Sequence, residues 1–181
     1  VPLGIAFLLR SHRAERIAGL FVVFMVLTGI VLWWRRRQSI PRIKGNVAAQ
    51  SADTVILVGS EGGATWGFAA TLHSALSNAG HCVHVAPMNS MAATYAKAER
   101  LLFLASTYGD GSAPASANRF MAQLAGSRVS IPFAILGFGD RAFPKFCRFA
   151  EEVETALRAR GWPALLPLNR IDRQSAQDFA R

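Results

Sequence analysis

Three short loops contain the residues of this sequence that could bind a ligand. The first loop is rich in hydroxyl and glycine residues and follows the apolar run Val55–Val58. Its members are Ser60, Glu61, Gly62, Gly63, Ala64 and Thr65. The backbone N–H groups of such a loop converge near the partly positive N-terminus of the following helix, and glycine lets an anion come close. The first loop therefore predicts a phosphate site.

The composition of the first loop excludes two common phosphate motifs. It has no lysine, whereas a Walker loop needs Gly-Lys followed by Ser or Thr. Its glycine spacing differs from a dinucleotide fingerprint, and the next expected strand leads to Asn89 without an acidic residue. Two interpretations remain: a phosphomonoester held by backbone and hydroxyl groups, or an ordinary tight strand-to-helix turn that binds nothing.

The second and third loops each place an aromatic residue among glycines. The second comprises Ser106, Thr107, Tyr108, Gly109, Asp110 and Gly111. The third comprises Gly137, Phe138, Gly139, Asp140, Arg141, Ala142, Phe143, Pro144, Lys145, Phe146 and Cys147. A planar isoalloxazine ring needs two aromatic faces and backbone groups for its polar edge. Either aromatic alone would indicate ordinary loop packing, but beside a phosphate loop they favour a flavin.

Alternating strands and helices are expected to position these loops. Strands are predicted at Thr54–Gly59, Cys82–Ala86, Arg100–Ala105, Ile131–Leu136 and Ala164–Leu168. The first strand is apolar without alternation, which is typical of a strand buried on both faces of a parallel sheet. Five strands that alternate with helices predict a doubly wound α/β fold, in which ligands bind beyond the carboxyl ends of the strands.

The helices are predicted from apolar spacing and from cap residues. A helix Thr65–Ala79 is expected to end at Gly80, and a short helical stretch is expected at Met91–Ala98. The apolar stripes of two further helices are Ala117, Phe120, Met121 and Leu124, and Phe146, Phe149, Ala150, Val153 and Leu157. A capping box at Ser175–Asp178 predicts a last helix that the end of the chain truncates.

The first third of the chain indicates a membrane segment. Residues 17–34 are 18 uncharged residues, which span roughly 27 Å as a helix. They end in Trp33-Trp34 before three arginines, whereas a signal peptide has a shorter apolar core and a small-residue cleavage site. We therefore expect a juxtamembrane segment at 1–16, a transmembrane helix at 17–34, a polar basic linker at 35–53 and an α/β domain at 54–181. Because the chain starts at Val1, it is expected to be a fragment of a longer protein.

The charge of the chain is concentrated beside this apolar run. The net charge is +9, and residues 1–50 hold eight Lys and Arg residues against one acid. This placement favours a membrane boundary over nucleic-acid binding. Because the flank after the run is the more basic one, the positive-inside rule places the α/β domain on the cytoplasmic side of the inner membrane. Cys82 and Cys147 show neither a disulfide framework nor metal-ligand spacing.

The motifs of the second and third loops resemble the FMN loops of flavodoxin-like domains in diflavin reductases, such as sulfite reductase flavoprotein and cytochrome reductases. The resemblance covers about residues 54–181, with three loops in the right order, and implies a flavodoxin-like five-stranded parallel sheet in the order 2-1-3-4-5. The segment from His12 to Arg37 resembles the last membrane helix of PepSY-type membrane proteins. Some of these are fused to a flavodoxin and then to a ferredoxin-reductase-like module.

The resemblance implies a role for each loop. The first loop, Ser60–Thr65, would hold the FMN phosphate. Ser106–Gly109 would line one face of the ring and its N5 edge, with Tyr108 stacking. Phe138–Cys147 would supply the other wall, with Phe143 stacking, and Asp172 stands where the family has an aspartate near the flavin.

The sequence departs from the family pattern at four positions. Gly62 stands where a hydroxyl residue is usual, and Phe143 stands where tyrosine is usual. Trp66 replaces a polar residue at the start of a helix. Glu61 is compatible with a phosphate only if its side chain points away from it.

Two functions are carried forward from the sequence. The first is an FMN electron-transfer domain that receives electrons from a FAD and NADPH module, and passes them to a haem, iron or other membrane or periplasmic acceptor. The second is a binding or regulatory module that has lost FMN. A phosphoacceptor receiver domain is excluded, because the third strand ends in Ala105-Ser106 rather than in aspartate. His12 is either a haem ligand within a complete membrane bundle or a solvated juxtamembrane residue.

Overall fold

The computed structural model describes residues 19–30, 43–91, 95–127 and 130–173. The chain divides into two units, Val1–Ser39 and Ile40–Arg181. The strands of the larger unit are β1 (Thr54–Gly59), β2 (Val83–Pro87), β3 (Arg100–Ser106), β4 (Phe133–Gly139) and β5 (Asn169–Asp172). Its helices are α2 (Thr65–Asn78), α3 (Phe120–Gly126), α4 (Arg148–Ala159) and the short 3-10 helix η1 (Met88–Ser90).

The five strands form one parallel sheet in the order β2-β1-β3-β4-β5, which confirms the predicted topology. Gly59 at the end of β1 lies opposite Ala105 of β3. Ser106 at the end of β3 lies opposite Phe138 of β4. The three strands that precede the three loops therefore end at the same edge of the sheet.

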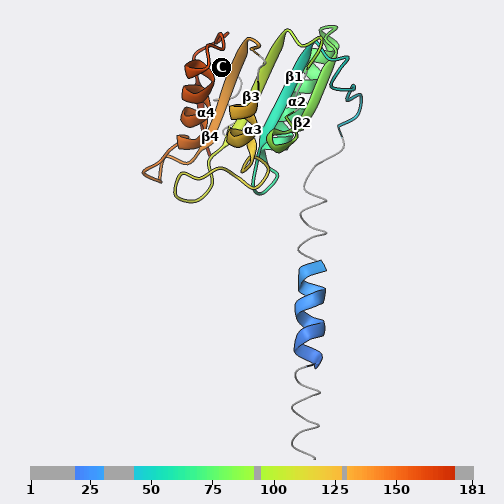
Figure 1. Ribbon diagram of the computed structural model, residues 1–181, viewed down its shortest axis with the longest axis vertical. Coiled ribbons are helices and arrows are strands. Elements are labelled where there is room, and N and C mark those ends of the chain that lie inside the picture. Colours follow the sequence, from blue (N-terminus) through green and yellow to red (C-terminus); the bar gives the residue numbers. More distant parts are fainter. Residues whose placement is uncertain (1–18, 31–42, 92–94, 128–129, 174–181) are drawn as a thin grey trace, which may run out of the picture. The chain divides into compact units, whose positions relative to one another are not determined.

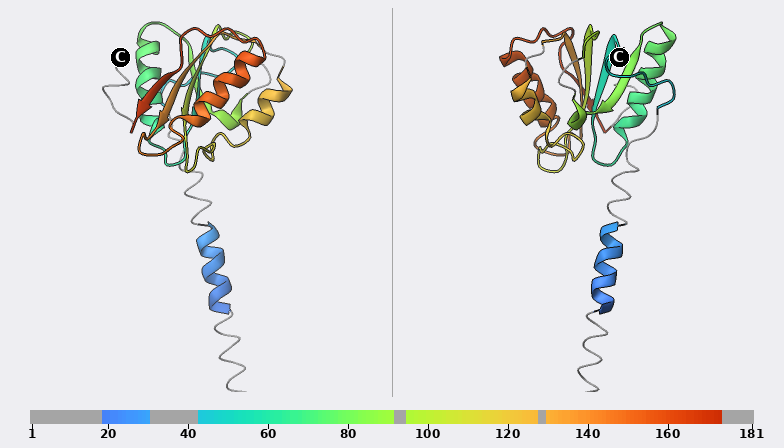
Figure 2. Two further views of the ribbon diagram at one scale, coloured as in Figure 1. Left: turned by 90° about the vertical axis from the view of Figure 1, so that its left-hand side faces the viewer. Right: turned by 45° about the vertical axis from the view of Figure 1, so that its right-hand side comes forward.

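Helices cover both faces of the sheet, α2 on one and α3 with α4 on the other (Figures 1 and 2). Side chains of a strand alternate between its two faces. Val55 and Leu57 accordingly join the core cluster beneath α3 and α4, whereas Ile56 and Val58 join the cluster beneath α2. All four are fully buried, which explains why β1 is apolar without alternation.

Two predicted strands are displaced by proline. Ile131–Leu136 was expected as a strand, but Pro132 has no N–H to donate, and β4 runs from Phe133 to Gly139. The prediction of the last strand at Ala164–Leu168 is wrong. Only Ala164 pairs there, as an isolated bridge to Phe133, and β5 follows Pro167 as Asn169–Asp172.

Helix predictions were accurate for α2 and less accurate elsewhere. α2 begins at Thr65, and Gly80 follows it with φ +91°, the left-handed conformation expected of a helix end. The prediction of helix at Met91–Ala98 is wrong for its described residues, 91 and 95–98, and the helical turn lies at Met88–Ser90 instead. The backbone leaves helical geometry at Met91, whose ψ is 118°. The last helix, predicted from Ser175, lies outside the described residues.

Two residues of the predicted apolar stripes are not on the buried face of a helix. Met121 of α3 is 37% exposed, while its neighbours Phe120 and Leu124 are buried. Phe146 precedes α4, which starts at Arg148. The remaining stripe residues of α4 are buried as predicted: Phe149, Ala150, Val153 and Leu157.

The C-terminal part of the expected linker belongs to the α/β domain, which corrects its assignment as a tether. The side chain of Asn46 forms two hydrogen bonds with the backbone of Val85. Its Nδ2 donates to the carbonyl of Val85 at 3.0 Å, and its Oδ1 accepts from the N–H of Val85 at 2.7 Å. The N–H of Val47 donates to the carbonyl of Val83 at 3.2 Å, and Ala52 is fully buried. This segment lies along β2 because its side-chain amide and backbone supply the partners that an edge strand lacks. Residues 35–42 lie outside the described residues.

In the smaller unit, residues 19–30 are helical. The eight side chains from Leu20 to Leu27 are each more than half exposed. Within the described part of the chain, no helix reaches the length and hydropathy that crossing a membrane requires. The rest of the expected membrane segment, residues 17–18 and 31–34, lies outside the described residues, as do His12 and Arg35–Arg37.

Candidate flavin-binding site

The first loop is closed by hydrogen bonds of Ser60. The side chain of Ser60 is buried, and its Oγ accepts a bond from the N–H of Gly63 at 3.1 Å. The N–H of Ser60 donates to Ser116 Oγ at 2.7 Å. Gly63 has φ +89°, a conformation that glycine adopts at no steric cost, and its carbonyl accepts from the N–H of Trp66 at 3.1 Å.

The start of α2 has the properties of an anion site. The helix has no side-chain N-cap bond and no acidic residue in its first turn, so nothing in the helix neutralises its partial positive charge. Thr65 is fully buried, and its Oγ1 has no hydrogen-bond partner among the described residues. An unpaired buried hydroxyl costs free energy. A phosphate oxygen at this helix end would provide the missing acceptor.

The departures from the family pattern leave the first loop open. The carboxylate of Glu61 accepts a hydrogen bond from the N–H of Ala115, which fixes the position of this side chain. Trp66 is 4% exposed and packs in the core cluster beneath α2. A Cβ added to Gly62 would meet no atom within 4 Å. None of these three residues obstructs the loop.

The second loop is a tight hairpin. Tyr108 and Ser112 exchange two backbone hydrogen bonds of 2.9 Å, and the residues between them include Gly109 with φ +51° and Gly111 with φ +87°. Ser106 Oγ donates to the carbonyl of Gly59 at 2.8 Å, which ties the second loop to the first. Tyr108 is 54% exposed, so its side chain is accessible to a ligand or solvent.

The third loop is held by two aspartates. Asp140 Oδ1 accepts from the N–H of Ala142 at 2.8 Å and from Nε of Arg173 at 3.1 Å. These bonds, the backbone one first, hold the pKa of Asp140 below its usual value. Asp172 Oδ1 accepts from the N–H of Arg141 at 3.0 Å, so Asp172 positions the loop. The guanidinium of Arg141 lies over the ring of Phe146, 5.4 Å from its centroid.

Gly137, Gly139 and Cys147 pack where α4 begins on the end of β4. A Cβ added to Gly137 would lie 2.8 Å from Ala150 Cβ, and one added to Gly139 would lie 2.8 Å from the N of Cys147. Cys147 is fully buried with φ 55°, and burial raises the pKa of its thiol to about 11. Cys147 is therefore a packing residue with an unreactive thiol.

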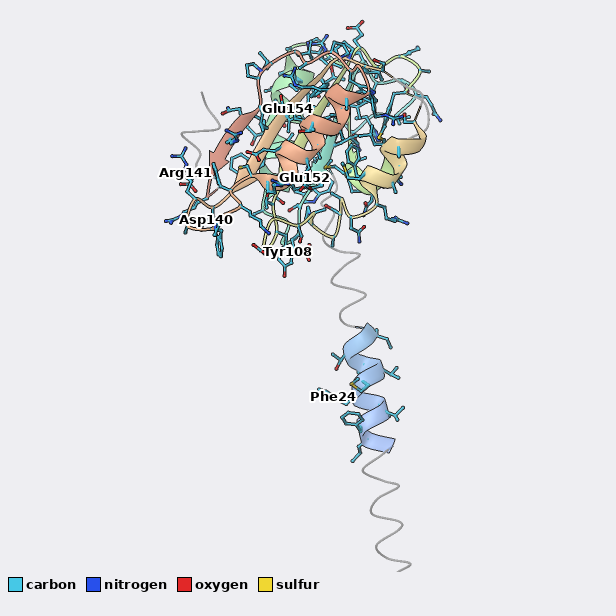
Figure 3. The ribbon with its side chains drawn as sticks, turned by 60° about the vertical axis from the view of Figure 1, so that its left-hand side comes forward. Phe24, Tyr108, Asp140, Arg141, Glu152 and Glu154 are labelled. Carbon is cyan, nitrogen blue, oxygen red and sulfur yellow. The ribbon has the colours of Figure 1, made fainter. Side chains whose placement is uncertain are left out.

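A cavity of about 480 Å³ opens between the second and third loops, a volume within the range of cofactor sites. Its lining residues are Ser106, Thr107, Gly109, Phe138, Gly139, Asp140, Phe143, Lys145 and Arg173. Tyr108 and Asp140 lie at the same end of the domain (Figure 3). The ring of Phe143 is 58% exposed at the cavity. The first loop is adjacent to this cavity through Ser106 rather than part of its wall.

The structure places some of the predicted site residues in the lining of the cavity, and it places the first loop, Tyr108 and Asp172 outside that lining. The cavity brings together eight of them, the lining residues other than Arg173. Phe138, one of these eight, is almost fully buried, and its ring packs against Phe68 with centroids 5.2 Å apart. Sequence reasoning missed Arg173, which lines the cavity, and Ser116, which holds the first loop. Arg173 follows a strand that was predicted in the wrong place, and Ser116 lies in no recognisable motif.

Comparison with known proteins agrees with this geometry. Residues 56–180 match the family model described as Flavodoxin. The chain belongs to the flavodoxin family. Flavodoxins and the flavodoxin domains of diflavin reductases bind FMN, the cofactor that the sequence predicted.

Relatives of this chain include much longer reductases. The sulfite reductase (NADPH) flavoprotein alpha-component of Shewanella sp. strain MR-7 is 35% identical over 130 residues, which cover 68% of this chain and 22% of that protein. The inducible nitric oxide synthase of Mus musculus is 27% identical over 137 residues, which cover 74% of this chain and 12% of that protein. The chain thus spans about a fifth or less of the length of these relatives. It is homologous to the flavodoxin domain of sulfite reductase flavoprotein.

Solved flavodoxin structures have the same fold. The structure of oxidised Flavodoxin 2 from Bacillus cereus is 25% identical, with a TM-score of 0.63, and the match covers 71% of this chain and 91% of that one. Flavodoxin 1 from the same organism has a TM-score of 0.62 at 20% identity. FMN fits the residues present: the Thr65 hydroxyl, which has no partner in the part of the chain that the structure describes, suits a phosphate, and the adjacent cavity suits an aromatic ring.

Proposed function

We propose that this chain is the FMN-binding electron-transfer part of a membrane-anchored, NADPH-dependent flavoprotein reductase. In this proposal electrons come from a FAD and NADPH module of the ferredoxin-reductase type and pass to a haem, iron or other membrane or periplasmic acceptor. The observation that carries the proposal is the cavity between the second and third loops, beside an α2 N-terminus that has no acid in its first turn.

The residues of the chain would bind and orient the cofactor. Thr65 and Ser60, with the N-terminus of α2, would hold the phosphate by hydrogen bonds and partial charge. Tyr108 and Phe143, both exposed at this edge, would contact the two faces of the ring. FMN, when bound, supplies the redox chemistry, and no side chain here is needed as an acid or base.

The need for a separate NADPH module is supported by the sequence and by relatives. The sequence contains no Gly-x-Gly-x-x-Gly fingerprint, and the described strands and helices between Thr54 and Asp172 build one α/β unit around a single five-stranded sheet. The Shewanella relative is named as an NADPH flavoprotein, and this chain matches 22% of it. We infer that NADPH binds the part of such a protein to which this chain does not correspond.

The direction of electron flow can be tested by flavin absorbance. The FMN-loaded chain, mixed anaerobically with NADPH alone, should stay oxidised for minutes. Addition of a ferredoxin-reductase-like FAD module should bleach it quickly. Rapid bleaching by NADPH alone would contradict the proposal and indicate an oxidoreductase that takes hydride itself. A folded chain that takes up no added FMN would support the alternative of a module that has lost the cofactor.

Membrane attachment rests on residues 17–37, which resemble the last helix of PepSY-type proteins. Eighteen uncharged residues followed by three arginines favour insertion with the α/β domain on the cytoplasmic side. The chain should therefore float with lipid vesicles and resist extraction by salt and alkaline carbonate. A chain that starts at residue 43 should stay in solution and still bind FMN. Flotation of the shortened chain would contradict residues 17–37 as the anchor.

A further inference from the structure

A serine outside the three loops holds the backbone of the first loop. Ser116 Oγ accepts a hydrogen bond from the N–H of Ser60 at 2.7 Å and lies 2.9 Å from the carbonyl oxygen of Ser60, to which it donates. Its distance to the carbonyl oxygen of Val58 is 3.3 Å. One side chain therefore fixes both polar groups of the Ser60 backbone, where the chain leaves β1.

The residue before this serine holds the acidic side chain of the same loop. The N–H of Ala115 donates to Glu61 Oε2. Ala115 and Ser116, which we call the 115–116 bracket, thus bind two acceptor groups of the first loop, the Glu61 carboxylate and the Ser60 carbonyl. These groups would repel a phosphate if they turned toward it, because all carry negative charge or partial negative charge.

The bracket is itself fixed to the sheet. The N–H of Asn89, after β2, donates to the carbonyl of Ser116 at 2.8 Å, and Asn89 Nδ2 donates to the carbonyl of Ala115 at 2.8 Å. The end of β1 lies against the same segment. A Cβ added to Gly59 would lie 3.2 Å from Ala117 Cβ and 3.5 Å from Pro114 Cγ. The bracket therefore has little freedom to follow a displaced loop.

The groups left to a ligand are then mainly donors. Within the described part of the chain, Ser60 Oγ accepts from the N–H of Gly63 and donates to nothing, so its proton is available to an anion. Thr65 Oγ1 has no partner in the described residues either, and the α2 N-terminus carries partial positive charge. Because the 115–116 bracket binds the Glu61 carboxylate and the Ser60 carbonyl, the first loop presents mainly hydrogen-bond donors, which favours a phosphomonoester.

We propose that Ser116 is a positioning residue for phosphate specificity, which acts through Ser60 without touching the ligand. This inference rests on the proposed FMN function of the first loop. Its consequence is selective: Ser116 should affect binding of a flavin that carries a phosphate and leave binding of the same ring without phosphate nearly unchanged.

The test compares FMN with riboflavin on the full chain, with affinities measured by quenching of flavin fluorescence. Ser116→Ala should lower the ratio of FMN to riboflavin affinity by roughly three- to tenfold, the effect expected of a lost hydrogen bond. Ser116→Thr keeps the hydroxyl and should restore most of the ratio. Ser74→Ala is the matched control, because Ser74 is an exposed serine of α2 whose hydroxyl donates to Ala70 within the helix.

The outcomes separate this inference from the proposed function. If the wild-type chain prefers FMN and Ser116→Ala keeps the same ratio, Ser116 does not position the phosphate loop. If Ser116→Ala weakens both flavins equally, its role is general stability, and the inference is overturned as well. If the wild-type chain binds neither flavin, the proposed function fails. Circular dichroism of each variant shows whether it is folded. Should Ser116→Ala not fold, Ser116→Cys takes its place, because it keeps the shape of the side chain and replaces the hydroxyl by a weakly hydrogen-bonding thiol, and it should lower the same ratio.

Discussion

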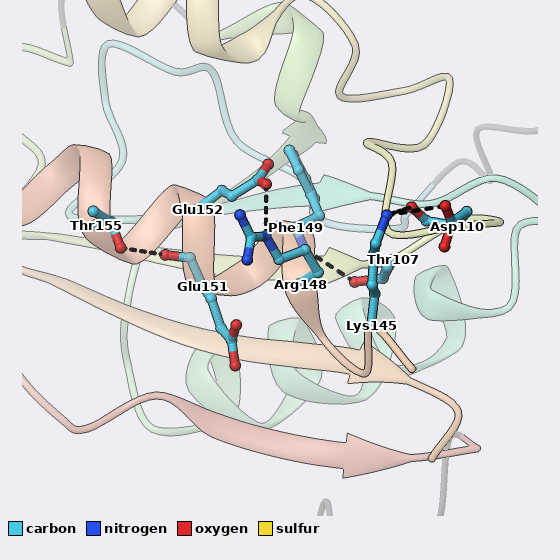
Figure 4. A network of polar contacts seen from close by, with 8 residues as sticks. All are labelled: Thr107, Asp110, Lys145, Arg148, Phe149, Glu151, Glu152 and Thr155. Carbon is cyan, nitrogen blue, oxygen red and sulfur yellow. Dashed lines mark hydrogen bonds and ion pairs between the residues drawn. The ribbon is translucent and has the colours of Figure 1, made fainter. Parts of the chain in front are cut away.

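Lys145 Nζ lies 2.9 Å from Asp110 Oδ2 and 3.2 Å from the carbonyl oxygen of the same residue (Figure 4). This contact joins the third loop to the tip of the second loop. Both loops contribute residues to the lining of the cavity. The alkyl chain of Lys145 passes over Gly111, where an added Cβ would lie 2.7 Å from Lys145 Cδ. Glycine at 111 therefore permits the lysine to cross the hairpin, and the pair sets the spacing of the two loops.

Lys145→Gln should weaken the binding of FMN and riboflavin by the same factor, about two- to fivefold. The ion pair is exposed, and exposed pairs contribute only about 0.2–1 kcal/mol. The effect should be shared because, in the proposed function, the cavity holds the ring and the first loop holds the phosphate. Titration by flavin fluorescence measures it, with Arg158→Gln as the control, since Arg158 pairs with Glu154 within α4. A loss confined to FMN would show that Lys145 contacts the phosphate instead.

Thr65→Val should have opposite effects on stability and on ligand binding. Valine has nearly the shape of threonine and removes a buried hydroxyl that has no partner among the residues that the structure describes, so the ligand-free chain should gain about 1 kcal/mol in free energy of unfolding. FMN affinity should fall roughly three- to tenfold, while riboflavin affinity stays constant. Urea unfolding and flavin titration check the two effects. Thr71→Val, on the exposed face of α2, is the control. Unchanged FMN affinity would remove Thr65 from the phosphate site.

Asp53 should make the stability of the fold depend on pH in the acid range. Its carboxylate accepts bonds from the N–H of Cys82 at 2.8 Å and from Thr54 Oγ1 at 2.7 Å, and these bonds lower its pKa below 3.8. Because the folded pKa is the lower one, the stabilisation is present above pH 3.8 and is lost as pH falls through the folded value.

Asp53→Asn should therefore lose about 1 kcal/mol near pH 7 and approach the wild type as the pH falls below 3.8. Urea unfolding of both chains between pH 7 and pH 3 measures the difference. Glu99→Gln is the control, because Glu99 is exposed and its carboxylate pairs with the neighbouring Arg100. A constant difference between Asp53→Asn and the wild type across this range would show that the charge of Asp53 is not the cause.

The two cysteines should differ in reactivity. Cys82 is exposed, whereas Cys147 is buried with a pKa raised to about 11. At pH 8 a disulfide reagent such as DTNB should modify one thiol rapidly in the folded chain and both in denaturant. Cys82→Ser should abolish the rapid reaction. The raised pKa also implies that stability falls as pH rises from about 9 through 11. Rapid modification of Cys147 in Cys82→Ser would contradict its burial at the start of α4.

The parts of the fold that sequence predicts well are those encoded locally. β1 has its predicted bounds, Thr54–Gly59, because an unbroken apolar run stands between polar Asp53 and a glycine loop. β5 was misplaced because its position depends on pairing with β4. Only Ile171 among its residues is fully buried, and the more apolar Leu165 and Leu166 are exposed.

The candidate site divides in the same way. The second and third loops carry glycines and aromatics that identify them in sequence, and the structure places most of them around one cavity. The contact between Ser116 and Ser60 spans 56 residues, and Ser116 is a common residue in an unremarkable stretch. Its role appears only when β1 and the chain before α3 are brought together.

The segment before β1 should contribute to folding rather than serve as tether. Asn46 supplies both a donor and an acceptor to Val85, and the carbonyl of Val47 accepts from His84 Nδ1 at 2.7 Å. Asn46→Ala would leave the N–H and carbonyl of Val85 without these partners, which should cost about 1–3 kcal/mol in free energy of unfolding. Asn78→Ala, at the exposed end of α2, should cost far less.

Truncations extend the same prediction. A chain that starts at residue 43 should match the α/β domain of the full chain in stability, whereas one that starts at residue 51 should be less stable than Asn46→Ala, because it also loses Val47. Both should bind FMN at temperatures where they are folded, since the three loops lie at the carboxyl edge of the sheet. Urea unfolding followed by circular dichroism measures the order. Equal stability of the chains from residues 43 and 51 would show that the segment lies on β2 without stabilising it, and that the tether extends to β1 as the sequence suggested.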